Sequence, residues 1–221
     1  EAADLLACIG VAFAIKGIMN GLGLQAFPKV SGSKGLQLYV PLNTAVTYEQ
    51  TSQFARAVAE LLEQRQPKAV VSTMAKIRRR GRVLIDWSQN SASKTTVSVY
   101  SMRGKNDRPF ISMPVTWDEL KRTAKAGKPE RLFFGPDEAL KRLKKIGDLF
   151  APVLKLKQKL PRAFAGAKPA APEPAPTRVR TRAKASPDPL RDYEAKRDFA
   201  KTREPGPRSA RRGAAKAQGK G

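Results

Sequence analysis

The sequence predicts an α+β fold over residues 1–160, followed by a basic tail without a core of its own. Apolar residues in the first part follow helical spacing in some stretches and form short β-branched runs in others. The tail, residues 161–221, holds nine prolines, 16 basic and six acidic side chains, and only three aromatic residues. Such a segment cannot offset the entropy lost on ordering, so we expect most of it to be disordered.

Helices are expected first where apolar residues recur every three or four positions. One spans residues 5–19 and ends near Gly21 or Gly23, because glycine readily adopts the left-handed conformation of a helix cap. A second begins after Thr47, which is followed three residues later by a glutamine and so forms a capping box. This helix ends before Pro67, which cannot continue it.

Strands are expected between and after these helices. Residues 26–30 and 36–40 are two candidates, and Pro28 places the first at a sheet edge because proline donates no hydrogen bond to a ladder. Residues 70–72 and 82–87 are β-branched or apolar runs that predict two more strands. Mixed strands and helices in this order favour a mixed sheet with flanking helices.

The last part of the core is predicted to be mainly helical. Residues 95–101 are β-branched enough for a strand, but a helical turn fits them as well. Thr116 and Glu119 form a second capping box, and Pro136 suits the first position of a final helix. Four residues of this final helix are expected to point inward: Ala139, Leu140, Leu143 and Ile146.

The charge and the missing residue types limit the function. With 43 basic and 19 acidic residues the chain carries a net charge of +24, which favours nucleic acid as a partner. A basic ribosomal or histone-like protein, or simply the composition of a high-GC bacterial proteome, would explain the same balance. No histidine is present, so histidine-based triads, zinc sites and general bases are excluded. The lone Cys8 fits a reducing cytoplasm, and the apolar stretch 5–18 is too short to span a membrane.

A short polar loop between the first two strands is a candidate anion site. Its sequence is SGSKG, residues 31–35. Small residues let backbone N–H groups approach an anion, and Lys34 adds a point charge. The loop does not satisfy the Walker A pattern, and such a pattern taken alone is more often an ordinary polar loop.

Three further features carry possible chemistry. Asp86 ends an apolar strand, where a carboxylate can hold a metal or cap the following turn. A basic run, residues 76–82, precedes that strand, and strand alternation would bring some of its guanidinium groups beside Asp86. Arg103 follows apolar neighbours, and buried arginine usually has an anionic partner.

Together these segments resemble the polymerase domain of bacterial ligase D. The similarity covers residues 3–160 and runs through VSGSKGLQLYVPL (30–42), STM (72–74) with Lys76 and Gly81, IDWSQN (85–90), KTT (94–96), YSMR (100–103), WDEL (117–120) and GDLF (147–150). In the tail, the segment that begins at Pro189 resembles the opening of the 3′-phosphoesterase module of the same ligases, although a charged linker is the alternative. The implied domains are the C-terminal part of the polymerase domain over 1–160, a Pro/Ala/basic linker over 161–187, and the start of that module or a basic tail over 188–221.

The resemblance implies a partial archaeo-eukaryotic primase-type core and a nucleotidyltransferase that works in repair of double-strand breaks by non-homologous end joining. Its cofactors would be Mn²⁺ or Mg²⁺, with NTP or dNTP as substrate, and its partners DNA ends, Ku, and ligase and phosphoesterase modules. It further implies a bacterial, cytoplasmic, nucleoid-associated protein. Asp86 matches the third metal-binding carboxylate of the family, and seven residues match nucleotide-binding positions: Ser31, Gly32, Lys34, Gln37, Arg79, Gln89 and Arg103.

Two departures from the family pattern bear on activity. The Asp-x-Asp motif that carries the other two carboxylates lies upstream of the segment matched here, so we expect this chain alone to be inactive. Many relatives have histidine where this chain has Gln37, which turns a charge-assisted phosphate contact into a neutral one. The alternative function is a catalytically dead, basic nucleic-acid-binding fragment that kept the fold.

Overall fold

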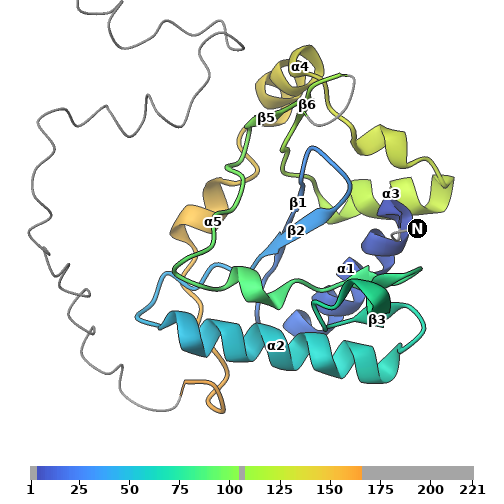
Figure 1. Cartoon of the computed structure of the whole chain (residues 1–221). Coiled ribbons are helices and arrows are strands. Elements are labelled where there is room, and N and C mark those ends of the chain that lie inside the picture. The colour runs from blue at the N-terminus through green and yellow to red at the C-terminus, as the bar shows by residue number, and fades with distance from the viewer. Residues whose placement is uncertain (1–3, 105–107, 166–221) are drawn as a thin grey trace, which may run out of the picture. The chain divides into compact units, whose positions relative to one another are not determined.

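The computed structural model describes residues 4–104 and 108–165 and shows a mixture of helices and short strands (Figure 1). The predicted α+β class is therefore confirmed. The predicted linker and phosphoesterase-like segment lie outside the described residues from position 166 onward. The elements, with 3₁₀ turns written η, are α1 Leu5–Gly21, β1 Phe27–Val30, β2 Leu36–Tyr39, α2 Tyr48–Arg65, β3 Val70–Val71, η1 Lys76–Arg79, β4 Val83–Leu84, η2 Trp87–Gln89, β5 Met102–Arg103, β6 Phe110–Ile111, α3 Trp117–Ala126, η3 Pro129–Leu132, α4 Pro136–Ile146 and α5 Ala151–Lys155.

Helices α1, α2 and α3 each begin where a side chain accepts a hydrogen bond from one of the first N–H groups. Both predicted capping boxes are present: Thr47 with Gln50 begins α2, and Thr116 with Glu119 begins α3. α3 ends at Gly127, whose φ of 64° lies in the left-handed region. Such caps depend only on residues a few positions apart, and this is why the sequence predicts them well.

Two buried clusters form the core and share helix α1. One contains Val11 and Met19 of α1 together with apolar residues of α2, β3 and β4. The other contains Leu5 and Ile9 of α1 together with residues of β1, β6 and α3. Helix α1 thus has apolar residues facing both clusters, as expected of a helix that is apolar all round.

The strands pair in three short ladders. β1 and β2 form an antiparallel hairpin in which Lys29 lies opposite Gln37, and β3 pairs with β4 in parallel. β5 and β6 form a third, antiparallel pair. β1 is an edge strand of this two-stranded sheet, as expected from Pro28. On its other side a single bridge joins Lys29 to Pro114, and the N–H of Val115 donates to the carbonyl of Pro28 at 3.1 Å. In Figure 1 the hairpin stands between the α1 and α2 helices and the β5–β6 pair.

Several predictions at the C-terminal side need correction. Residues 95–98 form neither strand nor helix, and β4 is shorter than the strand expected over 82–87. Helix α4 begins at Pro136 as predicted, but of its four expected inward residues only Ala139 is buried, and Leu140 is 59% exposed. Apolar spacing predicts the helix but not whether another element covers its face. Phe164 packs on Phe54, so contacts with the core continue past residue 160.

Candidate functional site

The SGSKG loop is a tight turn held together by its own first residue. The Ser31 Oγ accepts from the backbone N–H groups of Ser33 at 3.2 Å and Gly35 at 3.3 Å. The N–H of Ser31 donates to the Gly35 carbonyl at 2.9 Å and extends the β1–β2 ladder into the loop. Lys34 lies exposed at the loop. The loop therefore presents a fixed backbone and an exposed lysine beside the strand ends.

Arg103 lies directly against this loop, although 72 positions separate it from Ser31 in sequence. Its Nη1 donates to the Ser31 carbonyl at 3.4 Å. Gly32 has a φ of 69°, and a Cβ at that position would come within 3.0 Å of Arg103 Cγ and 3.1 Å of the Phe110 carbonyl oxygen. Glycine is therefore required by both conformation and space. The fold brings together the predicted residues Ser31, Gly32, Lys34 and Arg103.

Tyr100 fixes the segment that carries Arg103. It adopts a φ of 63°, which is costly for a bulky residue and must be held by its surroundings. Its backbone N–H donates to the Ser112 carbonyl at 2.7 Å, and its hydroxyl contacts Asp148 Oδ1 at 2.5 Å. Burial, followed by the hydrogen bond to Asp148, raises the pKa of Tyr100 far above its usual value. The side chain therefore stays neutral and acts as an anchor.

Lys29 is a residue of this site that the sequence did not indicate. The side chain lies in β1 and is completely buried, with an exposed fraction of 0%. Its Nζ donates to the carbonyl of Val97 at 2.7 Å and to Ser112 Oγ at 2.8 Å, and it lies 5.5 Å from the ring centroid of Tyr39. Burial, with the Arg103 cation adding to it, lowers the pKa of Lys29 to about 8. A lysine within a strand is usually solvated, so only the packing of distant segments could reveal it.

Gln37 occupies the position opposite Lys29 in the β1–β2 hairpin. Residues directly opposite in an antiparallel pair have side chains on the same face. Gln37 Oε1 is buried and accepts no hydrogen bond from the residues that the structure describes. A buried amide oxygen without a donor is uncommon and costs free energy, which makes it a pointer to function.

Asp86 and Gln89 form a second group of predicted residues. The exposed Asp86 carboxylate accepts from Ser88 Oγ at 2.6 Å and from Gln89 Nε2 at 2.8 Å. The Asp86 side chain accepts no hydrogen bond from the backbone N–H groups of the following turn, so the capping role expected as the alternative is not seen. The next residue, Trp87, donates its indole N–H to the Ser72 carbonyl at 2.9 Å and fixes the turn on which the carboxylate stands.

The arginines before β4 do not gather around Asp86 as strand alternation suggested. Arg78 pairs with Glu63 at 3.7 Å, Arg79 donates to the Met74 carbonyl, and Arg82 donates to the Pro67 carbonyl at 3.2 Å. Within residues 4–104 and 108–165 no ion pair includes Asp86. The reason is local: residues 76–79 form a 3₁₀ turn, in which side chains do not alternate as in a strand. The Arg79 Nε is buried and lacks an acceptor among these residues.

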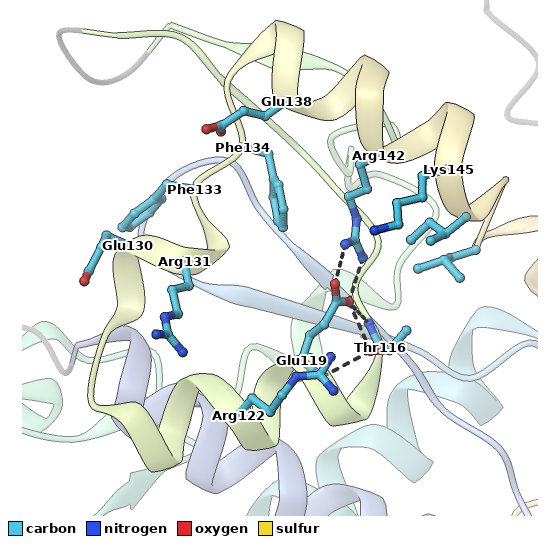
Figure 2. A pocket seen from close by; sticks show the side chains of 12 residues that line it. Thr116, Glu119, Arg122, Glu130, Arg131, Phe133, Phe134, Glu138, Arg142 and Lys145 are labelled. Atoms are coloured by element: carbon cyan, nitrogen blue, oxygen red, sulfur yellow. Dashed lines mark hydrogen bonds and ion pairs between the residues drawn. The ribbon is translucent and has the colours of Figure 1, made fainter.

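A separate hollow of about 560 Å³ lies between α3, η3 and α4 and contains none of the predicted site residues. Figure 2 shows the Arg142 guanidinium of α4 facing the Glu119 carboxylate of α3, with Arg142 Nη2 at 2.6 Å from Glu119 Oε2. Burial alone would raise the pKa of Glu119, but hydrogen bonds from Arg142 and Thr116 outweigh it and lower the pKa. Glu119 also belongs to the α3 capping box, so this ion pair joins two helices.

The positions of the acidic side chains determine whether the described residues can bind a divalent metal. In the described part of the chain, no three His, Cys, Asp or Glu side chains gather closely enough to hold a metal ion. Asp86 nevertheless offers an exposed carboxylate, and oxygen ligands of this kind are what Mg²⁺ and Mn²⁺ take. Asp86 thus fits one ligand position of a divalent metal and leaves the others to groups from elsewhere.

None of the described helices is long and apolar enough to cross a bilayer.

Comparisons with known proteins identify the family to which the chain belongs. A family model described as "LigD, primase-polymerase domain" matches residues 1–150. The chain is 46% identical over 143 residues to the multifunctional non-homologous end joining protein LigD of Mycolicibacterium smegmatis. The aligned region covers 65% of this chain and 18% of that protein. It is 31% identical over 145 residues to the bifunctional LigD of Bacillus subtilis, covering 65% of this chain and 23% of that one.

A solved structure gives the same result. The polymerase domain from Mycobacterium tuberculosis ligase D in complex with DNA matches with a TM-score of 0.62 and 40% identity, over 69% of this chain and 51% of that chain. The chain thus spans about half of the solved domain and about a fifth of its curated relatives. With a family model that matches more than half of its length, the chain belongs to the LigD primase-polymerase domain family.

Proposed function

We propose that this chain supplies the nucleotide-binding part and one metal-binding carboxylate of a polymerase that adds nucleotides to DNA ends in non-homologous end joining. Membership of the LigD primase-polymerase family supports nucleotidyl transfer as the class of reaction. The matched relatives are named non-homologous end joining proteins, and the solved one is in complex with DNA. The net charge of +24 suits the same polyanionic partner.

The contact of Arg103 with the Ser31–Gly35 loop is the observation that carries this proposal. Nucleotidyl transfer joins a primer 3′-oxygen to the α-phosphorus of a nucleoside triphosphate and releases pyrophosphate. The protein then has mainly to position the triphosphate and stabilise its negative charge. The fixed loop, the exposed Lys34 and the Arg103 guanidinium place two cations and several N–H groups in one small region, and together they can hold phosphates in a single orientation.

Asp86 is the residue of this chain that would hold a divalent metal. When bound, Mg²⁺ or Mn²⁺ would neutralise phosphate charge and lower the pKa of an attacking hydroxyl. Ser88 and Gln89 each donate one hydrogen bond to Asp86, which orients the carboxylate and leaves further oxygen lone pairs free. A single carboxylate is too little charge for two cations, so we propose that residues 1–221 alone bind nucleotide but do not add it to DNA.

Binding of ATP in the presence of Mn²⁺ tests the nucleotide site. We expect Arg103→Met and Lys34→Met each to weaken binding by about tenfold or more, because each removes a charge-assisted contact. Lys125→Met is the matched control, since Lys125 is an exposed lysine in the last turn of α3 and is not one of the predicted site residues. ATP binding that is unchanged in both loop variants would contradict the proposed site.

The second candidate is a nucleic-acid-binding fragment without catalysis. The dispersal of acidic side chains in the described residues favours it for this chain taken alone. The two functions differ in what happens when the upstream Asp-x-Asp segment is present. A polymerase gains metal-dependent nucleotide addition with that segment, whereas a purely binding protein gains none.

A further inference from the structure

Lys29 and Gln37 lie on the same face of the β1–β2 hairpin, and the role of the buried Lys29 cation in the proposed nucleotide site has not been assigned. Lys29 is fully buried, and its ammonium has three N–H groups. Two of them are taken by the Val97 carbonyl and Ser112 Oγ. Within the described residues no carboxylate pairs with this cation. Burying a lysine without an anionic partner is costly, so its retention requires a compensating role.

Gln37 offers the acceptor that the third N–H of Lys29 lacks. The two residues are directly opposite in the hairpin, so their Cβ atoms are about 5 Å apart and their side chains share one face. Gln37 Oε1 is the buried oxygen without a donor. One N–H and one carbonyl oxygen are thus both left over on the same face; no hydrogen bond joins them in the structure, and one ordered water or a rotation of the Gln37 side chain would connect them.

The geometry points to Lys29 as a positioning residue of the phosphate site: it holds the Gln37 amide by its oxygen, turns the amide NH₂ toward the bound triphosphate, and supplies the positive charge that a neutral amide lacks. An amide held by its oxygen has its two N–H donors on the opposite side. The inference rests on the proposed nucleotide function. In this arrangement the neutral Gln37 amide contacts the phosphate, and the positive charge is located one strand away, at Lys29.

Lys29 lies close to the other groups of the site. It lies in β1 two residues before Ser31, the first residue of the loop that follows this strand. Arg103 is near enough to lower the pKa of Lys29, so an anion held by Arg103 acts on Lys29 as well. Among the residues that the structure describes, Arg103 of β5 and Tyr39 of β2 are the charged and titratable groups found to act on Lys29. Burial raises the pKa of Tyr39, which therefore stays neutral.

This arrangement couples phosphate binding to a proton. Without ligand, Lys29 is partly deprotonated near pH 8, because burial and the Arg103 cation lower its pKa to about that value. A bound triphosphate raises the pKa again, so binding takes up a proton and weakens as the pH rises through that value. Loss of a proton from the triphosphate itself has the opposite sign, since the more charged anion binds cationic groups better.

The test is calorimetry of ATP binding to the 221-residue chain. Titrations near pH 8 in Tris and in HEPES, which differ in heat of ionisation, report the protons taken up. We expect proton uptake by the wild type and an affinity that falls about fivefold between about pH 7 and pH 9, the result of a pKa shift of one unit. Lys29→Met should take up no proton, bind ATP more weakly at neutral pH and show no fall over this range.

A double-mutant cycle tests whether Lys29 acts through Gln37. If it does, Lys29→Met and Lys29→Met with Gln37→Met bind ATP alike, whereas independent roles make the two losses add. Wild-type binding without proton uptake, or a folded Lys29→Met that binds with unchanged affinity and pH dependence, would overturn the inference alone. Failure of the wild type to bind ATP would overturn the proposed function and this inference together. The wild-type proton count decides the matter even if Lys29→Met does not fold.

Discussion

Arg103 packs on Gly32 so closely that a methyl group at position 32 would meet the Arg103 Cγ at 3.0 Å. The same methyl group would also lie 3.1 Å from the backbone of Ile111 and from the Phe110 carbonyl oxygen. Because backbone atoms cannot step aside as a flexible side chain can, the arginine and the loop must both shift. The loop and the arginine therefore form one unit, although the sequence separates them by 71 positions.

Gly32→Ala is expected to damage both stability and nucleotide binding. An alanine at a φ of 69° costs about 1–2 kcal/mol, and it would displace Arg103 from its place against the loop, where we propose that it binds phosphate. The control is Gly35→Ala in the same loop, where nothing lies within 4 Å of an added Cβ. Thermal unfolding and ATP titration of the two variants would measure the difference. Equal ATP affinity in Gly32→Ala and the wild type would show that the loop does not take part in phosphate binding.

The Glu119–Arg142 pair is expected to stabilise the fold in a pH-dependent way. The pKa of Glu119 lies below its usual value of 4.5 in the folded chain, so its contribution is present above that value and is lost as the pH falls through the folded pKa. Glu119→Gln should lower the free energy of unfolding near pH 7 by about 2 kcal/mol. It should also reduce the loss of stability on acidification.

Glu130→Gln is the matched control for this pair, because Glu130 lines the same hollow but is exposed (Figure 2). Urea unfolding of the wild type and both variants at several pH values would give the comparison. A Glu119→Gln variant as stable as the wild type near neutral pH would mean that the pair contributes nothing measurable.

The fold could be predicted where the signals are local. The capping boxes at Thr47 and Thr116, the hairpin strands around the SGSKG loop and the start of α4 at Pro136 all depend on residues within a few positions of one another. The exposure of Leu140 could not be predicted, because apolar spacing does not reveal whether a partner covers the face. The 3₁₀ turn over 76–79 was missed because a run of arginines carries no clear periodicity.

The candidate site was predictable only in part. Ser31, Gly32, Lys34 and Arg103 lie together as their similarity to the family suggested, and Asp86 lies with Gln89. Lys29 was not found, because its partners are Val97 and Ser112, far away in sequence. Its burial is a consequence of tertiary packing, which a single strand does not encode.

The basic tail is expected to strengthen DNA binding without regard to sequence. Residues 166–221 carry 15 basic and six acidic side chains. Deleting them should weaken binding to a DNA duplex and flatten the plot of log affinity against log salt, since each lost phosphate contact reduces the slope by about 0.9. Deleting only residues 213–221, which hold two lysines, is the control and should change the slope little. An unchanged slope after the full deletion would show that the tail does not contact DNA.

Asp86 gives the most direct test of the proposed polymerase. The measurement is metal-dependent addition of nucleotides to a primed DNA end by residues 1–221, by a form that also carries the upstream Asp-x-Asp segment, and by its Asp86→Asn variant. Asp86 is exposed, and in the described part of the chain its carboxylate accepts hydrogen bonds from Ser88 and Gln89, so the variant should keep its unfolding temperature. We predict addition by the longer form and none by Asp86→Asn or by residues 1–221 alone. Addition by Asp86→Asn at a rate near the wild type would contradict the assignment of this carboxylate.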